Sequence, residues 1–367
     1  MNRITRLRHP LATLVPLLVL VALASAFSQV SSALEQIVVQ DLILLTAVVG
    51  YYIFVGNSGV LSFGHVGFMA IGGYSAGILT LSPETRQTVL PGFPATLGGL
   101  QFTPYSAALI GGLVAAVAAA LLAGPLMRLT GIAAALTSFA VLQVIYVVIS
   151  HAQGLTGGTG GLSNIAEGGG VLPALLTALA AIALAFGYQR TRWGICLRAS
   201  REDPVAANAI GVHVHRQRGF AFVLSAFVIG VAGGLYGEFL GGLTPDTLYL
   251  TTTFMLVVML VTGGEKSLSG AVVGALFVSV VTQVLDQVQQ GFTVGGLTVK
   301  GPLGIAQIGL SVILLLVLIL RPSGLTRGRE LNLLWRGRTR AADPGDPIGG
   351  ADTEAGGAGA ETVSSLP

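Results

Sequence analysis

The chain has 367 residues, of which 53% are hydrophobic and only 10% are charged, and its mean hydropathy is +0.80. Because about a quarter of the residues in a soluble domain are charged, this composition indicates an integral membrane protein and excludes a soluble globular one. A net charge of +3 in such a chain reports membrane topology rather than nucleic-acid binding, and the single cysteine, Cys196, excludes an internal disulfide and a cysteine-based metal cluster.

Apolar segments of membrane-spanning length follow one another along the chain. A helix needs roughly 20 apolar residues to cross a bilayer core, and clusters of turn residues or charges separate the segments. The third segment is rich in glycine and the eighth is short, so each is a candidate for a broken or tilted span. We therefore predict an all-α polytopic membrane protein with about ten transmembrane helices, near residues 11–29, 34–55, 64–81, 105–128, 131–150, 171–188, 219–240, 250–262, 270–288 and 304–320.

Lysine and arginine indicate the orientation, because short cytoplasmic loops are enriched in them. Ten spans place both termini on one side of the membrane, and all 19 basic residues except Arg86 and Lys300 fall on that side. We therefore predict that both termini are cytoplasmic. The basic start, the apolar run and Ala24-Ser25-Ala26 also resemble a cleavable signal peptide, an alternative that leaves the orientation of the later spans unchanged.

The main polar interruption of the chain is the loop 189–218, which contains arginines, histidines, an acidic pair and a proline. Asp203 and Pro204 are typical first residues of a helix, and Gly211 tolerates the left-handed turn that ends one, so the sequence between them predicts a very short helix. This helix is nearly all apolar and too short to be stable alone in water. Either another protein covers it, or the loop folds back on its own span ends and the arginines only set the topology.

Four stretches of the sequence resemble the permease subunits of ABC importers for branched-chain amino acids. They are RWGICLRASREDPVAANAIG with the residues that follow it to Gly234, NSGVLSFGHVGFMAIGGYSAGIL at 57–79, LTGGTGGLSNI at 155–165, and LILRPSGL at 318–325. The resemblance implies a dimer of permease subunits, homomeric or heteromeric, in the cell's inner membrane. It also implies cytoplasmic ATP-binding subunits and an external solute-binding protein as partners.

The resemblance further implies that the loop 189–218 is the coupling loop that inserts into the ATPase. Permeases of importers carry Glu-Ala-Ala, three residues and then Gly, and Ala206, Ala207 and Gly211 have this spacing, whereas Val205 replaces the glutamate. It is open whether Glu202 or Asp203 pairs with the ATPase instead. We expect Ala206 and Ala207 to pack into a groove on the ATPase, and the candidate coupling residues are Arg201, Glu202, Asp203, Pro204, Ala206, Ala207 and Gly211.

The chain itself has no sequence motif for ATP binding. A phosphate-binding loop needs the pattern G-x-x-x-x-G-K-[ST], and TGGTGG at 156–161 lacks the lysine. No nucleophile, base or metal-ligand arrangement typical of an enzyme can be recognised either. We therefore expect no enzymatic activity, no metal and no cofactor in this chain, with ATP bound by the partner subunit.

Two of the family-like stretches supply candidates for the substrate pathway. The glycine-rich loop could receive a carboxylate on its backbone N–H groups, or it could be a turn that packs beneath the binding protein. His65 could act as a gate or proton carrier, or it could anchor a helix start by a hydrogen bond. The candidate pathway residues are Asn57, Ser58, Ser62, His65 and Phe68 from the first stretch, and Thr156, Gly157 and Gly158 from the second.

Acidic residues lie near the predicted external ends of the spans and not at mid-depth, at Glu35, Asp41, Glu238, Asp246 and Asp286. A proton-coupled carrier needs a titratable relay inside the membrane, so this distribution favours a pore that a separate ATPase drives. Residues 1–325 are the predicted permease domain, 326–340 a basic segment at the surface of membrane lipid, and 341–367 a disordered tail. We expect import of branched-chain or other hydrophobic amino acids, with urea or a short amide as the alternative solute and an ion-coupled carrier or channel as the alternative class.

Overall fold

The structure is a computed structural model that describes residues 17–22, 25, 32–92, 101–166, 168, 170–290, 292–294, 297–299, 304–321 and 324–326. The chain divides into a helical unit over residues 1–334 and a second unit over 335–367. The basic segment predicted at 326–340 lies outside the described residues except for Thr326, and the tail predicted at 341–367 lies outside them entirely.

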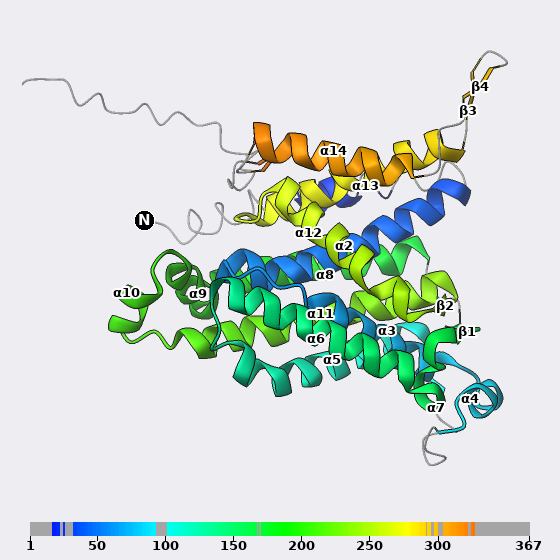
Figure 1. The fold of residues 1–367 in the computed structure, drawn as a ribbon, viewed down its shortest axis with the longest axis horizontal. Coiled ribbons are helices and arrows are strands. Elements are labelled where there is room, and N and C mark those ends of the chain that lie inside the picture. The colour runs from blue at the N-terminus through cyan, green and yellow to red at the C-terminus, as the bar shows by residue number, and fades with distance from the viewer. Residues whose placement is uncertain are drawn as a thin grey trace, which may run out of the picture. The chain divides into compact units, whose positions relative to one another are not determined.

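The helical unit consists of long apolar helices joined by short elements (Figure 1). Helices are found at nine of the ten predicted spans, whereas the first predicted span lies mostly outside the described residues. Seven of the described helices are long and apolar enough to cross a membrane. The long helices are α2 (Ser32–Ser58), α3 (His65–Thr80), α5 (Pro104–Leu126), α6 (Gly131–His151), α8 (Val171–Arg190), α11 (Val214–Leu240), α12 (Leu250–Gly263), α13 (Leu268–Gln290) and α14 (Ile305–Leu320).

Short elements lie at the two ends of the long helices. At one end lie α9 (Arg192–Glu202) and α10 (Pro204–Ala209); at the other lie α4 (Pro83–Val89), α7 (Gln153–Thr156) and two small antiparallel sheets (Figure 1). In the first sheet β1 (Leu162–Ser163) pairs with β2 (Gly242–Leu243), and Leu162 lies opposite Leu243. In the second, β3 (Phe292–Val294) pairs with β4 (Leu297–Val299). The 3-10 helices are η3 (Gly158–Gly160) and η4 (Pro245–Leu248).

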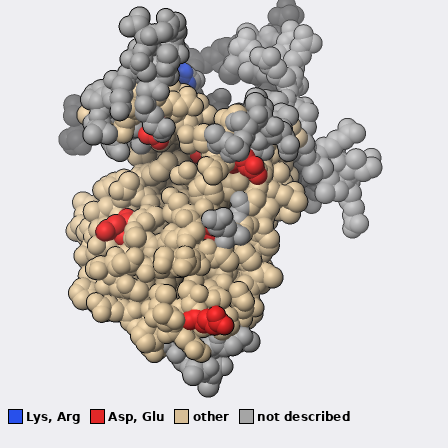
Figure 2. All heavy atoms as spheres, turned by 90° about the vertical axis from the view of Figure 1, so that its right-hand side faces the viewer, with Lys and Arg blue, Asp and Glu red and all other residues tan. Residues whose placement is uncertain are grey.

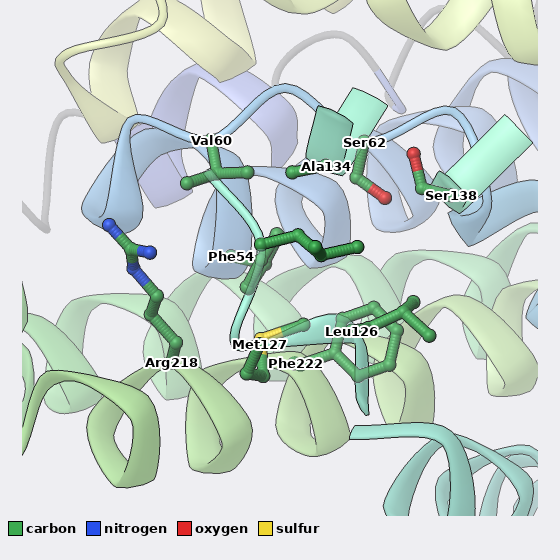
Figure 3. Close-up of a pocket in the computed structure, with 10 residues that line it drawn as sticks. Phe54, Val60, Ser62, Leu126, Met127, Ala134, Ser138, Arg218 and Phe222 are labelled. Carbon is green, nitrogen blue, oxygen red and sulfur yellow. The ribbon is translucent and has the colours of Figure 1, made fainter. Parts of the chain in front are cut away.

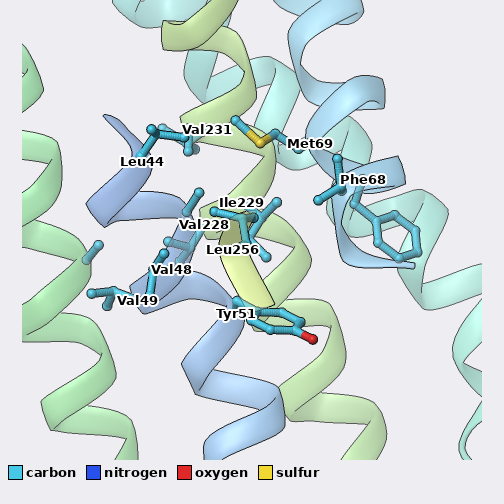
Figure 4. Packing of buried hydrophobic residues seen from close by; sticks show 14 of the residues in the cluster. Leu44, Val48, Val49, Tyr51, Phe68, Met69, Val228, Ile229, Val231 and Leu256 are labelled. Carbon is cyan, nitrogen blue, oxygen red and sulfur yellow. The ribbon is translucent and has the colours of Figure 1, made fainter. Parts of the chain in front are cut away.

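Helix α11 packs against α2, α3 and α5, and together these helices form much of the buried core (Figure 4). The contact with α3 is so close that a Cβ atom at Gly72 would lie 2.2 Å from the carbonyl oxygen of Gly230. In a membrane, where lipid is as apolar as the side chains, small residues stabilise helix pairs by allowing the backbones to approach. Some of the many glycines in the sequence therefore lie at helix–helix contacts and not in loops.

The third predicted span is a short helix preceded by non-helical chain. After α2 ends at Ser58, residues 59–64 run alongside neighbouring helices before α3 begins at His65. The Tyr51 hydroxyl donates to the Ser62 carbonyl at 2.8 Å, and the Phe63 N–H donates to the Ser138 hydroxyl at 3.0 Å. Irregular backbone at membrane depth is stable when protein groups satisfy its hydrogen bonds. Residues 59–64 can therefore stay non-helical, and α3 has only 16 residues.

The two ends of the helices differ in charge. The arginine-rich loop 189–218 lies at the end that holds α9 and α10 (Figure 1). The opposite end, seen in Figure 2, shows several acidic patches and little basic surface among the described residues. One arginine of the described residues at that end, Arg86 in α4, is buried and donates to the carbonyls of Leu79 and Leu81, and burial lowers the pKa of its guanidinium.

Candidate functional site

The predicted short helix is present as α10, and its ends form as the sequence indicates. The Asp203 carboxylate accepts from the backbone N–H of Val205 at 2.8 Å and of Ala206 at 3.0 Å, and Pro204 is the first helical residue. Gly211 has a φ of +84°, the left-handed conformation that glycine adopts without strain. The role of Asp203 within the chain is therefore to cap α10.

One face of α10 is open and the other is buried by the chain itself. Val205 and Ile210 are 77% and 79% exposed, and Ala206 and Asn208 are also exposed. Ala207, by contrast, is only 3% exposed. The methyl group of Ala207 packs within the chain, whereas Ala206 is exposed, and the packing of both alanines against an ATPase stays a prediction.

Arg201 holds the loop to the ends of two distant helices. Its Nη1 donates to the carbonyl of Gly56 at 2.6 Å, and its Nη2 forms an ion pair with Glu265 Oε1 at 2.7 Å. Gly59, with a φ of +69°, lies so close that a Cβ atom there would be 2.7 Å from Arg201 Cγ. We call Arg201, Gly56, Gly59 and Glu265 the Arg201 junction. The sequence-predicted role of Arg201 in coupling is compatible with this position, but its side chain points into the permease and is only 13% exposed.

The Arg201 junction is continuous with the end of the closing LILRPSGL stretch. Glu265 lies in the turn between α12 and α13, and the N–H groups of Leu325 and Thr326 donate to the carbonyls of Thr262 and Gly263 in the last turn of α12. Three of the family-like stretches are thus linked through the Arg201 junction and the end of α12: 57–79 through Gly59, the loop 189–218 through Arg201, and 318–325 through Leu325.

A second connection joins the start of the loop to α2. The Gln189 side-chain amide donates to the Tyr52 hydroxyl, and Arg198 donates to the Gln189 carbonyl at 2.7 Å. The second half of α9 is therefore bonded to α2 twice, directly through Arg201 and indirectly through Arg198 and Gln189. A displacement of α9 and α10 cannot leave the end of α2 in place without breaking these bonds.

The candidate pathway residues of the first stretch are all buried at the α2–α3 connection. Asn57 donates to the Ile53 carbonyl and Ser58 accepts from the Val60 N–H, at 3.0 and 3.2 Å. His65 Nδ1 lies 2.8 Å from the Ser62 hydroxyl. The His65 ring is surrounded at centroid distances of 5.2 to 6.3 Å by four aromatic rings, those of Tyr51, Phe54, Phe68 and Phe222.

A small cavity adjoins the four aromatic rings that surround His65 (Figure 3). Its wall is mainly apolar, and its polar side chains are Ser62, Ser138 and Arg218. Because Asn57, Ser58, Ser62, His65 and Phe68 are each at most 3% exposed, none of them lines an open passage in this structure.

The glycine-rich loop lies apart from these residues, at the opposite end of the helices (Figure 1). The Thr156 hydroxyl donates to the Ile149 carbonyl at 2.6 Å, and Gly157 and Gly158 have φ values of +77° and +61°. A Cβ atom at Gly157 would lie 2.1 Å from the Gly161 carbonyl oxygen. The loop folds tightly on itself and leads into β1, which ties the end of α6 to the end of α11.

The sequence analysis missed Glu265 and Gly56. Glu265 stands in TGGEKSLSG, a second glycine-rich segment whose small-residue spacing is similar to that of NSGVLSFGH, and this similarity is the signal that could have indicated it. Within the described residues, no three histidine, cysteine, aspartate or glutamate side chains come together as a metal site would require.

Comparisons with known proteins agree with these features. Residues 33–320 match the sequence model of the family described as branched-chain amino acid transport system / permease component. The high-affinity branched-chain amino acid transport system permease protein LivM of Escherichia coli (strain K12) is 26% identical over 306 residues, which cover 74% of this chain and 68% of the relative. The probable branched-chain amino acid transport permease protein LivH of Methanocaldococcus jannaschii is 31% identical over 37% of this chain and 41% of the relative. The nucleoside ABC transporter permease protein NupC of Lactococcus lactis is 34% identical over 19% of this chain and 22% of the relative. No solved structure matches the chain.

Proposed function

Because the chain belongs to the family of branched-chain amino acid ABC transporter permeases, we propose that it carries branched-chain or other hydrophobic amino acids into the cytoplasm. It is a multi-pass inner-membrane protein and the permease subunit of an ABC importer. The names of its LivM and LivH relatives support the substrate class.

The proposed topology has ten spans and both termini in the cytoplasm. The arginine-rich end with α9 and α10 then faces the cytoplasm, in agreement with the enrichment of basic residues in cytoplasmic loops. The end with α4, α7 and the two small sheets faces outward, where an external solute-binding protein delivers the solute.

The proposed partners follow from the family and from the surface of α10. A second permease subunit completes the transmembrane part, and separate cytoplasmic subunits bind and hydrolyse ATP. The observation that carries this proposal is an apolar helix that is capped by Asp203, held by Arg201 and open at Val205 and Ile210. Exposed apolar side chains of this kind are typical of an interface.

In the proposed mechanism, the ATPase moves α10 and the Arg201 junction transmits this movement. Arg201 bonds the end of α2 and the α12–α13 turn at the same time, so both follow α9. Since α2 continues into the chain that leads to α3, the aromatic rings around His65 shift when α2 moves. Coupled movement of these helices opens and closes the passage.

The substitution Ile210→Arg tests the proposed interface. A buried unpaired charge costs at least about 1 to 3 kcal/mol, so ATPase association should weaken about tenfold or more, and ATP-dependent uptake should fall with it. Leu155→Arg is the matched control, because Leu155 is 45% exposed on α7, outside the predicted spans and at the opposite end. Co-purification of the ATPase through a tag on this chain measures both variants. Full association of Ile210→Arg would show that α10 is not the ATPase contact.

A further inference from the structure

Four polar and aromatic residues form a connected group between α6 and η4. Gln143 and Tyr146 are one turn apart on α6, and Asp246 and Tyr249 are equally spaced in and just after η4. We call these four residues the outer polar cluster. Neither the family-like motifs nor the Arg201 junction includes any of them.

The contacts within the outer polar cluster are specific. The Tyr146 hydroxyl donates to Asp246 Oδ1 at 2.9 Å, and the Tyr249 hydroxyl donates to Gln143 Oε1. The two tyrosine rings stack, with centroids 4.1 Å apart and planes inclined by 22°. Each helical segment thus contributes one ring to the stack and one polar group beside it.

The depth and the polarity of the cluster argue against lipid as its environment. Tyr146 is fifteen residues beyond Gly131, the first residue of α6, and so lies about 22 Å along a helix that crosses a core of about 30 Å. Asp246 is nevertheless exposed, and Gln143, Tyr146 and Tyr249 are partly exposed. Ionised and amide side chains are costly against hydrocarbon and normally face water, a solute or another protein in membrane proteins.

The free groups of the cluster match a zwitterionic amino acid. Asp246 Oδ1 is bonded to Tyr146, so Oδ2 stays available to accept from an ammonium group. Gln143 Oε1 is bonded to Tyr249, so the amide nitrogen retains donors for a carboxylate. The stacked rings provide apolar area for an aliphatic side chain. Phe254, five residues after Tyr249 on α12, is a further exposed aromatic side chain, with 55% of its surface accessible.

We propose that the outer polar cluster is a recognition subsite for amino acids at the outer mouth of the translocation pathway, an inference that rests on the proposed function. Asp246 binds the ammonium group and Gln143 the carboxylate of the solute. The tyrosine stack holds both helical segments in register and contacts the aliphatic side chain. The subsite receives the solute from the binding protein before the inner part of the pathway opens.

The test uses the complete transporter, purified with its ATPase, second permease subunit and binding protein and reconstituted into proteoliposomes. Uptake of radiolabelled leucine and ATP hydrolysis stimulated by the leucine-loaded binding protein are measured on the same vesicles. The variants are Asp246→Asn, which removes the charge, and Asp246→Glu, which keeps it. Glu84→Gln is the matched control, because Glu84 is a carboxylate in α4 at the same end but outside the cluster.

For Asp246→Asn, loss of one charge-assisted contact to the solute should lower uptake about tenfold, while stimulated ATP hydrolysis stays near the wild-type value. Asp246→Glu should recover part of the uptake, and Glu84→Gln should match the wild type. Wild-type uptake by Asp246→Asn overturns the inference. So does a parallel loss of uptake, ATP hydrolysis and co-purifying permease subunit, which would identify this face as an assembly interface. Failure of the wild type to transport any hydrophobic amino acid contradicts the proposed function instead.

Discussion

Removal of the Arg201 side chain should separate ATP hydrolysis from transport. In Arg201→Ala, the hydrogen bond to the Gly56 carbonyl and the ion pair with Glu265 are lost together. The exposed face of α10 is unchanged by this substitution, since Val205 and Ile210 lie beyond the Asp203 cap. The ATPase should therefore still bind, but its movement should no longer reach α2 and the α12–α13 turn.

The two contacts of Arg201 differ in strength. A hydrogen bond from a charged group contributes about 1.5 to 3 kcal/mol. The ion pair contributes only about 0.2 to 1 kcal/mol, because the Glu265 side chain is 42% exposed and water screens it. Together the two contacts stabilise the Arg201 junction by about 2 to 4 kcal/mol. Loss of about 2 kcal/mol of this stabilisation lowers the ratio of molecules whose loop 189–218 is bonded to α2 to molecules whose loop is detached by about thirtyfold.

The assay is the number of leucine molecules transported for each ATP hydrolysed in proteoliposomes. Arg201→Ala should lower this ratio severalfold, and Glu265→Gln should lower it less because the bond to Gly56 remains. Gly59→Ala should resemble Arg201→Ala, since its new methyl group would displace the arginine. Arg192→Ala is the matched control, a charge removal at an exposed position of the same helix. A wild-type ratio in Arg201→Ala would refute the role of the junction in transmission.

Three further outcomes follow from the described contacts. Cys196, on α9, should resist a membrane-impermeant maleimide in intact cells and react after permeabilisation; labelling in intact cells would reverse the orientation. Asp203→Ala should weaken ATPase association severalfold, because loss of a helix cap costs about 0.5 to 2 kcal/mol, whereas Asp203→Asn should retain the cap and the association. Gly72→Ala should lower the melting temperature and the yield of folded protein, since its Cβ would collide with Gly230 and overpacking costs about 1 to 3 kcal/mol. Gly124→Ala, where no atom lies within 4 Å of the added Cβ, should leave both unchanged.

Local signals in the sequence were sufficient to predict most of the helices and the short helix α10. Apolar runs of membrane-spanning length locate nine described helices, and Asp203, Pro204 and Gly211 define α10 because caps act through neighbouring residues. The burial of Ala207 could not be predicted in this way, since it depends on the tertiary position of the whole loop.

Contacts between distant residues were beyond the reach of sequence patterns. The partners of Arg201 are 145 and 64 residues away along the chain, and Tyr146 lies 100 residues from Asp246. None of these three separations follows a helical or strand period, so one sequence gives no sign of these pairs. The glycines of the third span indicate that it is broken or tilted, as the short α3 is. The hydrogen bonds of residues 59–64 to Tyr51 and Ser138 are evident only in three dimensions.

The most direct test of amino acid import is uptake by the purified transporter in proteoliposomes that contain ATP. With the binding protein outside, radiolabelled leucine should accumulate inside the vesicles only when ATP is hydrolysed, and excess unlabelled isoleucine or valine should compete, whereas a nucleoside or urea should not. Accumulation without ATP, driven instead by an ion gradient, would contradict an ATP-driven permease. Competition by a nucleoside or urea but not by any hydrophobic amino acid would contradict the proposed substrate.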